Sequence, residues 1–475
     1  MARPKFVLLP SHSPEAFAPV LGEEEYRRVD AAAARGREQF KGRVIWHVSS
    51  TLRGGGVAEM LRALLPYVRG AGIDTRWAVL REDPWFFRLT KRIHNNLHED
   101  PGDGGPLEAD QRAIYEQTLA RSARQFEGLI HGDDVVFLHD PQTAGLAPHV
   151  ARLGATVVWR CHIGVDDPGE TALRAQHFLA PDLGAADLCV FSRPGLVWPG
   201  LRGGRCHVMA PSIDPFSPKN QELGPGRVDA ILNAVGLLAG NGPEPPLFTC
   251  ADGSPGRVER RAEVLQEEPI PAGAKLVAQV SRWDRLKDPE GLLDCLATEL
   301  EPARDLHLLL AGPDVSAVAD DPEGAQVWAE VCARRAAMPA AIRRRVHLAG
   351  LPMADLDENG AVVNAIQRRA DVVVQKSLAE GFGLTVTEAM WKRRPVVGSH
   401  IGGIAEQIVD GESGVLVDPR DSRELAGAVL GLLDDPGRAR RLGDAAHDRV
   451  RRHYLGAVRL AEYGDLLAEV KSVPE

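Results

Sequence analysis

Residues 376 to 390 read Lys-Ser-Leu-Ala-Glu-Gly-Phe-Gly-Leu-Thr-Val-Thr-Glu-Ala-Met, directly after a valine-rich run from Asp371 to Gln375. A short β-branched run, a glycine turn and an apolar stretch predict a buried strand, a tight connection and a helix. Glu380 would lie at the strand end, and Glu388 about one turn into the helix. In a doubly wound sheet, strand ends and the helix N-termini after them line the ligand crevice. The stretch therefore predicts a ligand site, although a plain strand-to-helix connection with a solvated carboxylate is the alternative.

The same alternation of short β-branched runs and longer helical patterns continues along the chain, and it indicates βαβ units with parallel sheets. The expected strands of the first half are Arg43 to Val48, Thr75 to Leu80, Val135 to His139, Thr156 to Arg160, Leu188 to Ser192 and Cys206 to Ala210. Those of the second half are Lys275 to Val280, Leu306 to Ala311, Val346 to Ala349, Ala370 to Gln375, Pro395 to Gly398 and Gly414 to Val417. We expect an α/β protein of two Rossmann-like domains whose parallel sheets face a crevice between the domains.

The domain boundaries follow from turn-rich segments and from composition. Residues 211 to 226 contain several prolines and glycines and read as an interdomain connection, and residues 241 to 271 read as a loop. The predicted parts are an N-terminal helical extension (1–42), a first Rossmann-like domain (43–215), a second Rossmann-like domain (216–455) and a C-terminal helix that packs back on the first domain (456–475).

The composition is that of an ordinary globular enzyme. The 475 residues are 44% hydrophobic and 26% charged, and the formal net charge is -10, which argues against a general nucleic-acid surface. No apolar run approaches the roughly 18 residues that span a bilayer, and the N-terminus lacks a signal-peptide pattern. We expect a cytoplasmic protein. The six cysteines are dispersed without a CxxC pair, so neither a zinc site nor a disulfide framework is predicted.

A glycine-rich turn follows the first expected strand. Gly54, Gly55 and Gly56 precede a helical pattern, and such a turn lets the backbone approach a ligand closely. It matches neither the Walker nor the GxGxxG pattern, and a purely structural turn explains it equally well.

Two cations follow the strand that ends at Val280. Arg282 and Lys287 are five residues apart, so both can point into one crevice, and two cations suit a leaving diphosphate on which charge accumulates. The alternative is an exposed loop in which they pair with Asp284 and Asp288.

Polar residues follow two further strands of the first half. His162 can hydrogen-bond a sugar hydroxyl near the reacting carbon, although an isolated histidine is more often structural. Asp140 and Gln142 offer a carboxylate and an amide that suit polyol hydroxyls, and an Asp-Pro turn is the alternative. All these signals lie at carboxyl ends of expected strands, which favours a single crevice.

As a set, these residues resemble the retaining glycosyltransferases of the GT-B fold, family 4, and within that group the trehalose glycosyltransferring synthases. The segments that carry the resemblance are Val48 to Thr51 with Gly54 to Leu61, His139 to Gln142, Trp159 to His162, Pro211 to Pro215 with Ser217 to Asn220, and Val374 to Ser377 running into Glu380. The resemblance covers about residues 43 to 420.

The resemblance implies transfer of glucose from a nucleoside-diphosphate glucose to glucose or another small sugar acceptor, with retention at the donor carbon, to form trehalose. The residues that it implies are catalytic are His162, Arg282, Lys287 and Glu380. Those implied for the donor are Gly55, Gly56, Gly381, Phe382, Gly383, Leu384, Thr385 and Glu388, and those implied for the acceptor are Asp140 and Gln142. No metal ligands and no required cofactor are predicted, while Mg²⁺ on the donor diphosphate is compatible with the sequence, as is a homodimer.

Three other functions stay open at this point. A trehalose phosphorylase would share the fold and the two glutamates but use glucose 1-phosphate, so it would act without a nucleotide. A non-catalytic sugar-binding protein would keep the fold and bind without turnover. A nucleotide-sugar epimerase would convert the donor alone.

Overall fold

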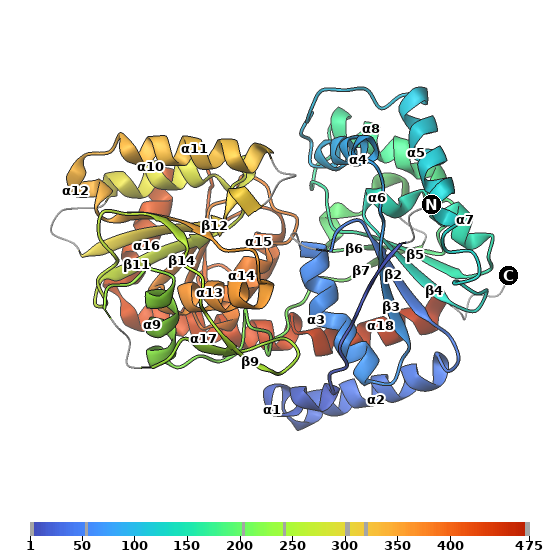
Figure 1. Ribbon diagram of the computed structural model, residues 1–475, viewed down its shortest axis with the longest axis horizontal. Coiled ribbons are helices and arrows are strands. Elements are labelled where there is room, and N and C mark those ends of the chain that lie inside the picture. The colour runs from blue at the N-terminus through green and yellow to red at the C-terminus, as the bar shows by residue number, and fades with distance from the viewer. Residues whose placement is uncertain are drawn as a thin grey trace. The chain divides into compact units, whose positions relative to one another are not determined.

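The computed structural model describes residues 4–52, 56–201, 205–240, 244–299, 305–317 and 322–470. The chain divides into two compact units, of which the first comprises Met1–Ser212 with Tyr454–Glu475 and the second Ile213–His453. Each unit contains one seven-stranded sheet (Figure 1).

The sheet of the first unit has the order β1-β3-β2-β4-β5-β6-β7. Its strands are β1 (Lys5–Val7), β2 (Ile45–Ser49), β3 (Thr75–Val79), β4 (Val135–His139), β5 (Thr156–Cys161), β6 (Leu188–Phe191) and β7 (Cys206–Val208). All neighbours pair in parallel except β1, which pairs antiparallel with β3. The order reverses between β2 and β4, and this point of a doubly wound sheet is where ligands bind.

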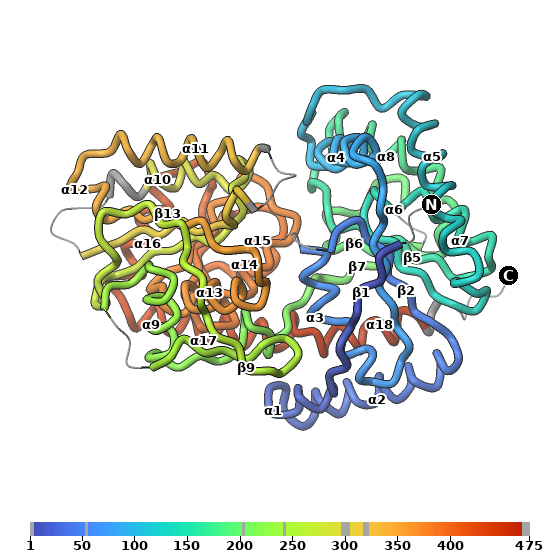
Figure 2. The backbone as a smooth tube through the Cα atoms, in the orientation of Figure 1, coloured from blue at the N-terminus to red at the C-terminus, as the bar shows by residue number. Residues whose placement is uncertain are grey.

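Helices cover both faces of this sheet. They are α1 (Ala18–Leu21), α2 (Glu23–Gln39), α3 (Gly56–Gly70), α4 (Pro84–Leu97), α5 (Ala109–Ala123), α6 (Pro141–Ala144), α7 (Ala147–Ala151), α8 (Glu170–Leu183) and α18 (Gly456–Val470). One core joins Trp46 and Trp159 of the sheet to Phe86 of α4 and Phe178 of α8. On the other face Phe137 packs with residues of α3 and α18. Both ribbon and tube show α2 and α18 side by side (Figures 1 and 2).

The sheet of the second unit has the order β10-β13-β12-β11-β14-β15-β16. Its strands are β10 (Glu263–Leu265), β11 (Lys275–Val280), β12 (Leu306–Pro313), β13 (Val346–Leu351), β14 (Val372–Gln375), β15 (Val396–Ser399) and β16 (Val415–Val417), and β8 (Leu247–Thr249) forms a separate hairpin with β9 (Pro255–Arg257). Only β10 of the sheet is antiparallel. Here the order reverses between β11 and β14.

Helices cover this second sheet in the same way. They are α9 (Pro225–Ala234), α10 (Pro289–Glu299), α11 (Pro322–Ala336), α12 (Ala340–Arg343), α13 (Leu356–Arg369), α14 (Leu384–Trp391), α15 (Gly402–Gln407), α16 (Ser422–Asp434) and α17 (Pro436–His453). Apolar residues of β11, β12 and β14 pack with α10, α11 and α16 in one core, which includes Leu292, Val331 and Val429. Helices α9 and α13 lie side by side in both views (Figures 1 and 2).

The doubly wound α/β fold is confirmed, and each of the twelve expected strands coincides with an observed strand within a few residues. Two expectations need correction. The N-terminal segment is not only helical, because Lys5–Val7 adds strand β1 to the first sheet. Residues 241 to 271 are not only loop, because β8, β9 and β10 lie there in the described part. These strands have three residues each, too few to display a period of two, and their pairing depends on distant partners.

Among the described residues, no helix combines the length and the apolar character needed to cross a bilayer.

Candidate functional site

The second unit brings a predicted cation and a predicted carboxylate together at the point where its strand order reverses. Lys287 ends the short 3-10 turn Arg285–Lys287 after β11, and Glu380 follows β14. The Lys287 Nζ and Glu380 Oε2 atoms are 2.5 Å apart, and their side chains are only 14% and 12% exposed. A partly desolvated pair of this kind is held more firmly than a surface ion pair.

A second ion pair lies beside the first. Asp288 adopts a left-handed conformation with φ 44°, and its carboxylate pairs with the Lys376 ammonium group. Gln279, buried in β11, accepts a hydrogen bond from the Lys376 backbone N–H at 2.9 Å and donates one to the Lys287 carbonyl at 2.9 Å. Neither Gln279 nor Lys376 was a predicted site residue. A glutamine within an otherwise apolar buried strand was the available signal, because a buried amide needs partners.

Arg282 lies in a different environment from Lys287. Its side chain is 51% exposed and pairs with Asp284 at 3.0 Å. This contact matches the alternative of an ion-paired loop, and it leaves the guanidinium group accessible to solvent. Glu380 is thus joined to one of the two predicted cations.

The turn from Gly381 to Thr385 is fixed by its surroundings. Gly383 has φ 89°, a conformation that favours glycine, and it is the N-cap of α14. A Cβ on Gly403 would lie 2.3 Å from the Phe382 Cα, so α15 approaches the turn closely. The Thr385 hydroxyl donates to Gln375 Oε1 at 2.9 Å. The backbone N–H groups at the start of α14 are therefore held in one geometry.

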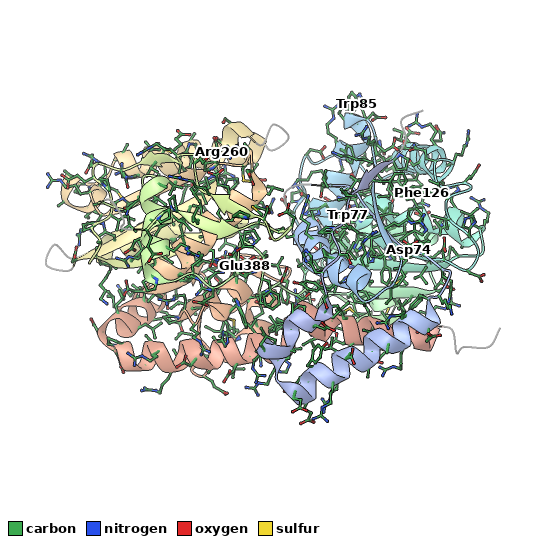
Figure 3. The ribbon with its side chains drawn as sticks, turned by 60° about the horizontal axis from the view of Figure 1, so that its bottom comes forward. Asp74, Trp77, Trp85, Phe126, Arg260 and Glu388 are labelled. Carbon is green, nitrogen blue, oxygen red and sulfur yellow. The ribbon has the colours of Figure 1, made fainter. Side chains whose placement is uncertain are left out.

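Glu388 lies on α14, where it is buried (Figure 3). Its Oε1 atom is 3.1 Å from Lys219 Nζ. Lys392, one turn further along the helix, donates to the Glu388 carbonyl at 3.1 Å, to Asn220 Oδ1 at 2.9 Å and to Gln367 Oε1 at 2.8 Å. Burial lowers the pKa of Lys392 well below its ordinary value, while the Glu388 charge opposes this effect. Neither lysine was a predicted site residue.

In the first unit, Asp140 follows β4 in a strained conformation, with φ 61° and ψ 179°. Strained non-glycine residues of this kind cluster at functional sites. Its Oδ1 atom accepts a hydrogen bond from the His162 backbone N–H at 2.8 Å, and its carbonyl accepts one from Trp159 Nε1 at 3.2 Å. Burial raises the pKa of Asp140 to about 7.

Three histidines form a row across β2, β4 and the end of β5. His47 Nδ1 lies 3.1 Å from His139 Nε2, and His139 Nδ1 lies 3.4 Å from His162 Nε2. The row ends where His162 Nδ1 lies 3.1 Å from the Ser192 hydroxyl. Burial lowers the pKa of His47 to about 3 and those of the other two well below their ordinary values, so the imidazoles are neutral near pH 7.

The row of histidines limits the contacts that His162 can make with a sugar. Both of its ring nitrogens already face protein atoms, so a hydrogen bond from the ring to a sugar would have to replace the contact with His139 or Ser192. The sugar contact of His162 stays a prediction.

Arg160 lies next to this row and was not predicted as a site residue. It is buried, its Nη2 donates to the Met209 carbonyl at 3.3 Å, and its guanidinium lies 5.4 Å from the centre of the Tyr463 ring. Burial lowers its pKa to about 9. An arginine in the buried strand Thr156 to Arg160 was the available signal.

Gln142 and the glycines Gly55 and Gly56 are the other predicted residues of the first unit. Gln142 lies on α6, and its buried Oε1 has no hydrogen-bond partner in the described part of the chain, which is the condition of a group that can receive a ligand. Gly56 begins α3, and Gly55 lies outside the described residues. No cluster of metal-ligating side chains occurs among the described residues.

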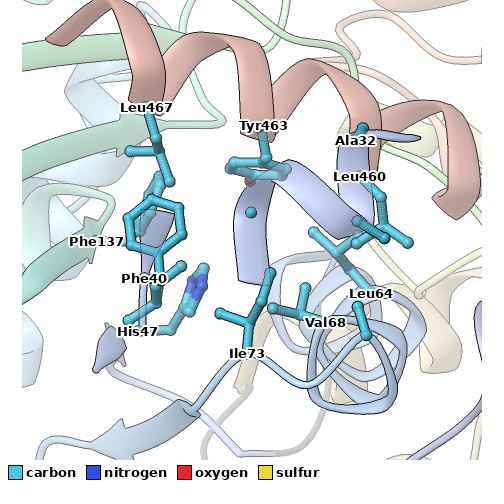
Figure 4. Close-up of a pocket in the computed structure, with 15 residues that line it drawn as sticks. Ala32, Phe40, His47, Leu64, Val68, Ile73, Phe137, Leu460, Tyr463 and Leu467 are labelled. Atoms are coloured by element: carbon cyan, nitrogen blue, oxygen red, sulfur yellow. The ribbon is translucent and has the colours of Figure 1, made fainter. Parts of the chain in front are cut away.

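The first unit also encloses a cavity of about 40 Å³ between its sheet and helices α2, α3 and α18 (Figure 4). Its walls are apolar apart from the His47 ring and the Tyr463 hydroxyl. Sugar sites need several converging polar groups, which the lining of this cavity lacks.

Two known sequence families match parts of this chain. Residues 47–197 match the sequence family "Trehalose synthase, N-terminal domain", and residues 260–449 match "Glycosyl transferases group 1". The chain is 34% identical over 453 residues to a trehalose synthase of Pyrococcus horikoshii, with 95% of each chain covered. The chain belongs to the trehalose synthase family. Another member, from Rubrobacter xylanophilus, is 34% identical with 94% of each chain covered.

More distant relatives place the trehalose synthase family in a wider context. A trehalose phosphorylase of Pleurotus pulmonarius is 25% identical, and the match covers 85% of this chain but 54% of that protein. A solved trehalose-phosphate synthase (UDP-forming) from Burkholderia xenovorans, in complex with glucose-6-phosphate, has a TM-score of 0.65 at 17% identity, with 90% of this chain and all of that chain covered. The family and the GT-B fold predicted from the sequence are confirmed, and the protein is a trehalose-related hexosyltransferase.

Proposed function

We propose that this protein transfers glucose from a nucleoside-diphosphate glucose to glucose and forms trehalose, with retention at the donor carbon. The observation that supports this most is the Lys287–Glu380 pair at the carboxyl ends of β11 and β14, where a doubly wound sheet binds nucleotides. A cation there is suited to a diphosphate, and a carboxylate there is suited to sugar hydroxyls.

Each site residue then has a role in the proposed reaction. Lys287 and Arg282 stabilise the charge that develops on the leaving diphosphate, together with the N–H groups at the start of α14. Glu380 holds the donor sugar, and Glu388 accepts hydrogen bonds from the nucleotide ribose. Asp140 and Gln142 hold the acceptor, and His162 contacts the donor sugar.

The proposed chemistry requires no protein nucleophile. The bond between the anomeric carbon and the diphosphate oxygen breaks while the acceptor oxygen bonds to the same face of that carbon. The proton of the acceptor hydroxyl passes to the departing phosphate oxygen, so charges and atoms balance. A glucosyl adduct trapped on Glu380 would refute this path. Neither a cofactor nor a metal ion is required in the proposal, and turnover that persists in EDTA would support this.

The test is to incubate the full-length protein with glucose and each of ADP-glucose, UDP-glucose and GDP-glucose, and to follow nucleotide release and sugar products by NMR. Trehalose with an α,α linkage supports the proposal and also identifies the base. Nucleotide release without trehalose would support a glycosyltransferase but would contradict glucose as its acceptor. Epimerisation of the nucleotide sugar in the absence of an acceptor would contradict the proposed glucose transfer.

A trehalose phosphorylase is the second candidate, because relatives with that activity align over most of this chain. Incubation with glucose 1-phosphate and glucose, without nucleotide, separates the two. Trehalose and free phosphate from that mixture would favour the phosphorylase. Binding of donor without turnover under every condition would favour a sugar-binding protein.

A further inference from the structure

The segment from Ser217 to Asn220, here called the 217–220 turn, is held by hydrogen bonds within the turn and to Asp214. The Asp214 carbonyl accepts hydrogen bonds from the Ser217 hydroxyl at 2.9 Å and from Asn220 Nδ2 at 3.1 Å. Asn220 Nδ2 also lies 3.3 Å from the Ser217 hydroxyl. The turn therefore has a fixed shape of its own.

Two helices of the second unit hold this turn in place. Asn364 of α13 donates to the Pro218 carbonyl at 3.0 Å and to the Gln221 carbonyl at 2.9 Å. Trp391, at the end of α14, donates to the Asn220 carbonyl at 3.2 Å. A Cβ on Gly360 of α13 would lie 3.3 Å from the Lys219 backbone nitrogen, so the turn lies directly against this helix.

The buried Lys392 joins the turn to the helix that carries Glu388. Its Nζ atom lies within hydrogen-bond distance of three acceptors, the Glu388 carbonyl, Asn220 Oδ1 and Gln367 Oε1. The backbone around Lys219 is thus fixed relative to α14, and the direction in which its side chain leaves is fixed with it.

Lys219 is the residue that this arrangement brings to Glu388. The Lys219 Nζ and Glu388 Oε1 atoms are 3.1 Å apart, and the two side chains are 21% and 3% exposed. A carboxylate as buried as that of Glu388 needs a compensating charge to stay ionised, and a contact at one oxygen restricts how the carboxylate turns.

We propose that Lys219 is a positioning residue for nucleotide binding, which acts on the ribose through the Glu388 carboxylate. The inference rests on the proposed function, in which Glu388 accepts hydrogen bonds from the ribose hydroxyls. Lys219 restricts the orientation of this carboxylate, so that it meets the ribose without reorganisation.

The experiment compares nucleotides that differ only in the hydroxyls that Glu388 would bind. Calorimetric titrations of the full-length protein with ADP and UDP, each beside its 2′,3′-dideoxy analogue, are made for the wild type and for Lys219→Met. We expect Lys219→Met to weaken binding of the ribose nucleotide by about tenfold or more, because a hydrogen bond to a charged group is weakened. Binding of the dideoxy nucleotide should change by less than about twofold.

A role in folding or in phosphate binding would weaken both nucleotides equally, and either that result or no weakening overturns the inference. Lys219→Arg keeps a cation at this position and should restore part of the preference for ribose. Lys275→Met is the matched control, because Lys275 forms an exposed ion pair with Asp371 at 3.0 Å in the same unit. If Lys219→Met fails to fold, Lys219→Gln, which also removes the charge, is titrated in its place: loss of the ribose preference at an unchanged melting temperature supports positioning, and an unchanged preference opposes it.

Glu388→Gln separates failure of this inference from failure of the proposed function. If Glu388→Gln loses the preference for ribose and Lys219→Met keeps it, only the inference about Lys219 fails. If Glu388→Gln weakens both nucleotides equally, or if the wild type binds no nucleotide, the proposed role of Glu388 and the inference fail together.

Discussion

The predicted site residues of the two units have different polar surroundings. Around those of the second unit, lysines meet carboxylates in the pairs Lys287–Glu380, Lys376–Asp288 and Lys219–Glu388. In the first unit, the row of histidines is neutral and Asp140 has a raised pKa. Charged pairs suit an anionic ligand such as a diphosphate, whereas neutral donors and acceptors suit sugar hydroxyls. This difference in charge supports the proposal that the second unit binds the donor and the first unit binds the acceptor.

The largest expected effect comes from removing a cation of the second unit. Lys287→Ala should lower kcat by about 100-fold to 1,000-fold, because it removes stabilisation of the charge on the leaving group. The loss of catalysis should far exceed the loss of stability that follows from leaving Glu380 without this partner. Steady-state kinetics with thermal melts tests this, and Lys275→Ala, which removes an exposed lysine of the same unit, is the control. Normal turnover with a lower melting temperature would contradict the assignment.

The next effect concerns Asp140 of the first unit. Since burial raises its pKa to about 7, the folded state binds a proton more tightly than the unfolded chain. Below about pH 4 the carboxyl is protonated in both the folded and the unfolded state, so it does not change the free energy of unfolding. As pH rises to about 7, the unfolded chain loses this proton while the folded state keeps it, and the free energy of unfolding falls. We expect Asp140→Asn to unfold with the same free energy as the wild type near pH 4 and to be more stable by a few kcal/mol near pH 8.

Urea unfolding of both proteins across this pH range measures the difference. A difference that does not vary with pH would show that folding leaves the pKa of Asp140 unchanged. The variant should also have a higher KM for the acceptor, with little change in the KM for the donor.

A smaller effect is expected at the far end of the histidine row. His47 has a pKa of about 3 in the folded state, so below about pH 6.5 the unfolded chain binds a proton that the folded state rejects. Wild-type stability should therefore fall as pH drops from about 6.5 towards 3. His47→Gln should remove about 2 kcal/mol of this loss at pH 5. Unfolding measured at pH 7 and pH 5 tests this, and an equal loss in both proteins would mean that other groups dominate.

The smallest expected effect is that of Arg282, which is half exposed and already paired with Asp284. Arg282→Met should lower kcat/KM for the donor by only about threefold at low salt, because solvent screens an exposed charge. The difference from the wild type should shrink as NaCl is added, and the KM for the acceptor should stay constant. A loss of turnover comparable to that of Lys287→Ala would show that the guanidinium contacts the leaving group directly.

The sequence predicts the parts of this protein whose signals are local. The twelve strands that the sequence predicts lie in short, mostly apolar runs bounded by turns, and the stretch from residue 376 to 390 shows strand end, turn and helix within fifteen residues. Strand β1 was missed because its three residues become a strand only through pairing with β3. The Lys219–Glu388 pair and the histidine row were also missed, because their members are far apart in the chain and only the folded sheet brings them together.

The first unit is assembled from both sides of the second in the sequence, since residues 454 to 475 return to it after the second unit has ended. During synthesis, all residues of the second unit leave the ribosome before α18 does. The face of the first sheet that carries Phe137 therefore lacks its contacts with Tyr463 and Leu467 at a stage when the second unit can already fold. Chaperone binding to ribosome-held chains that stop at residue 453 should therefore map to that face and disappear once α18 has emerged.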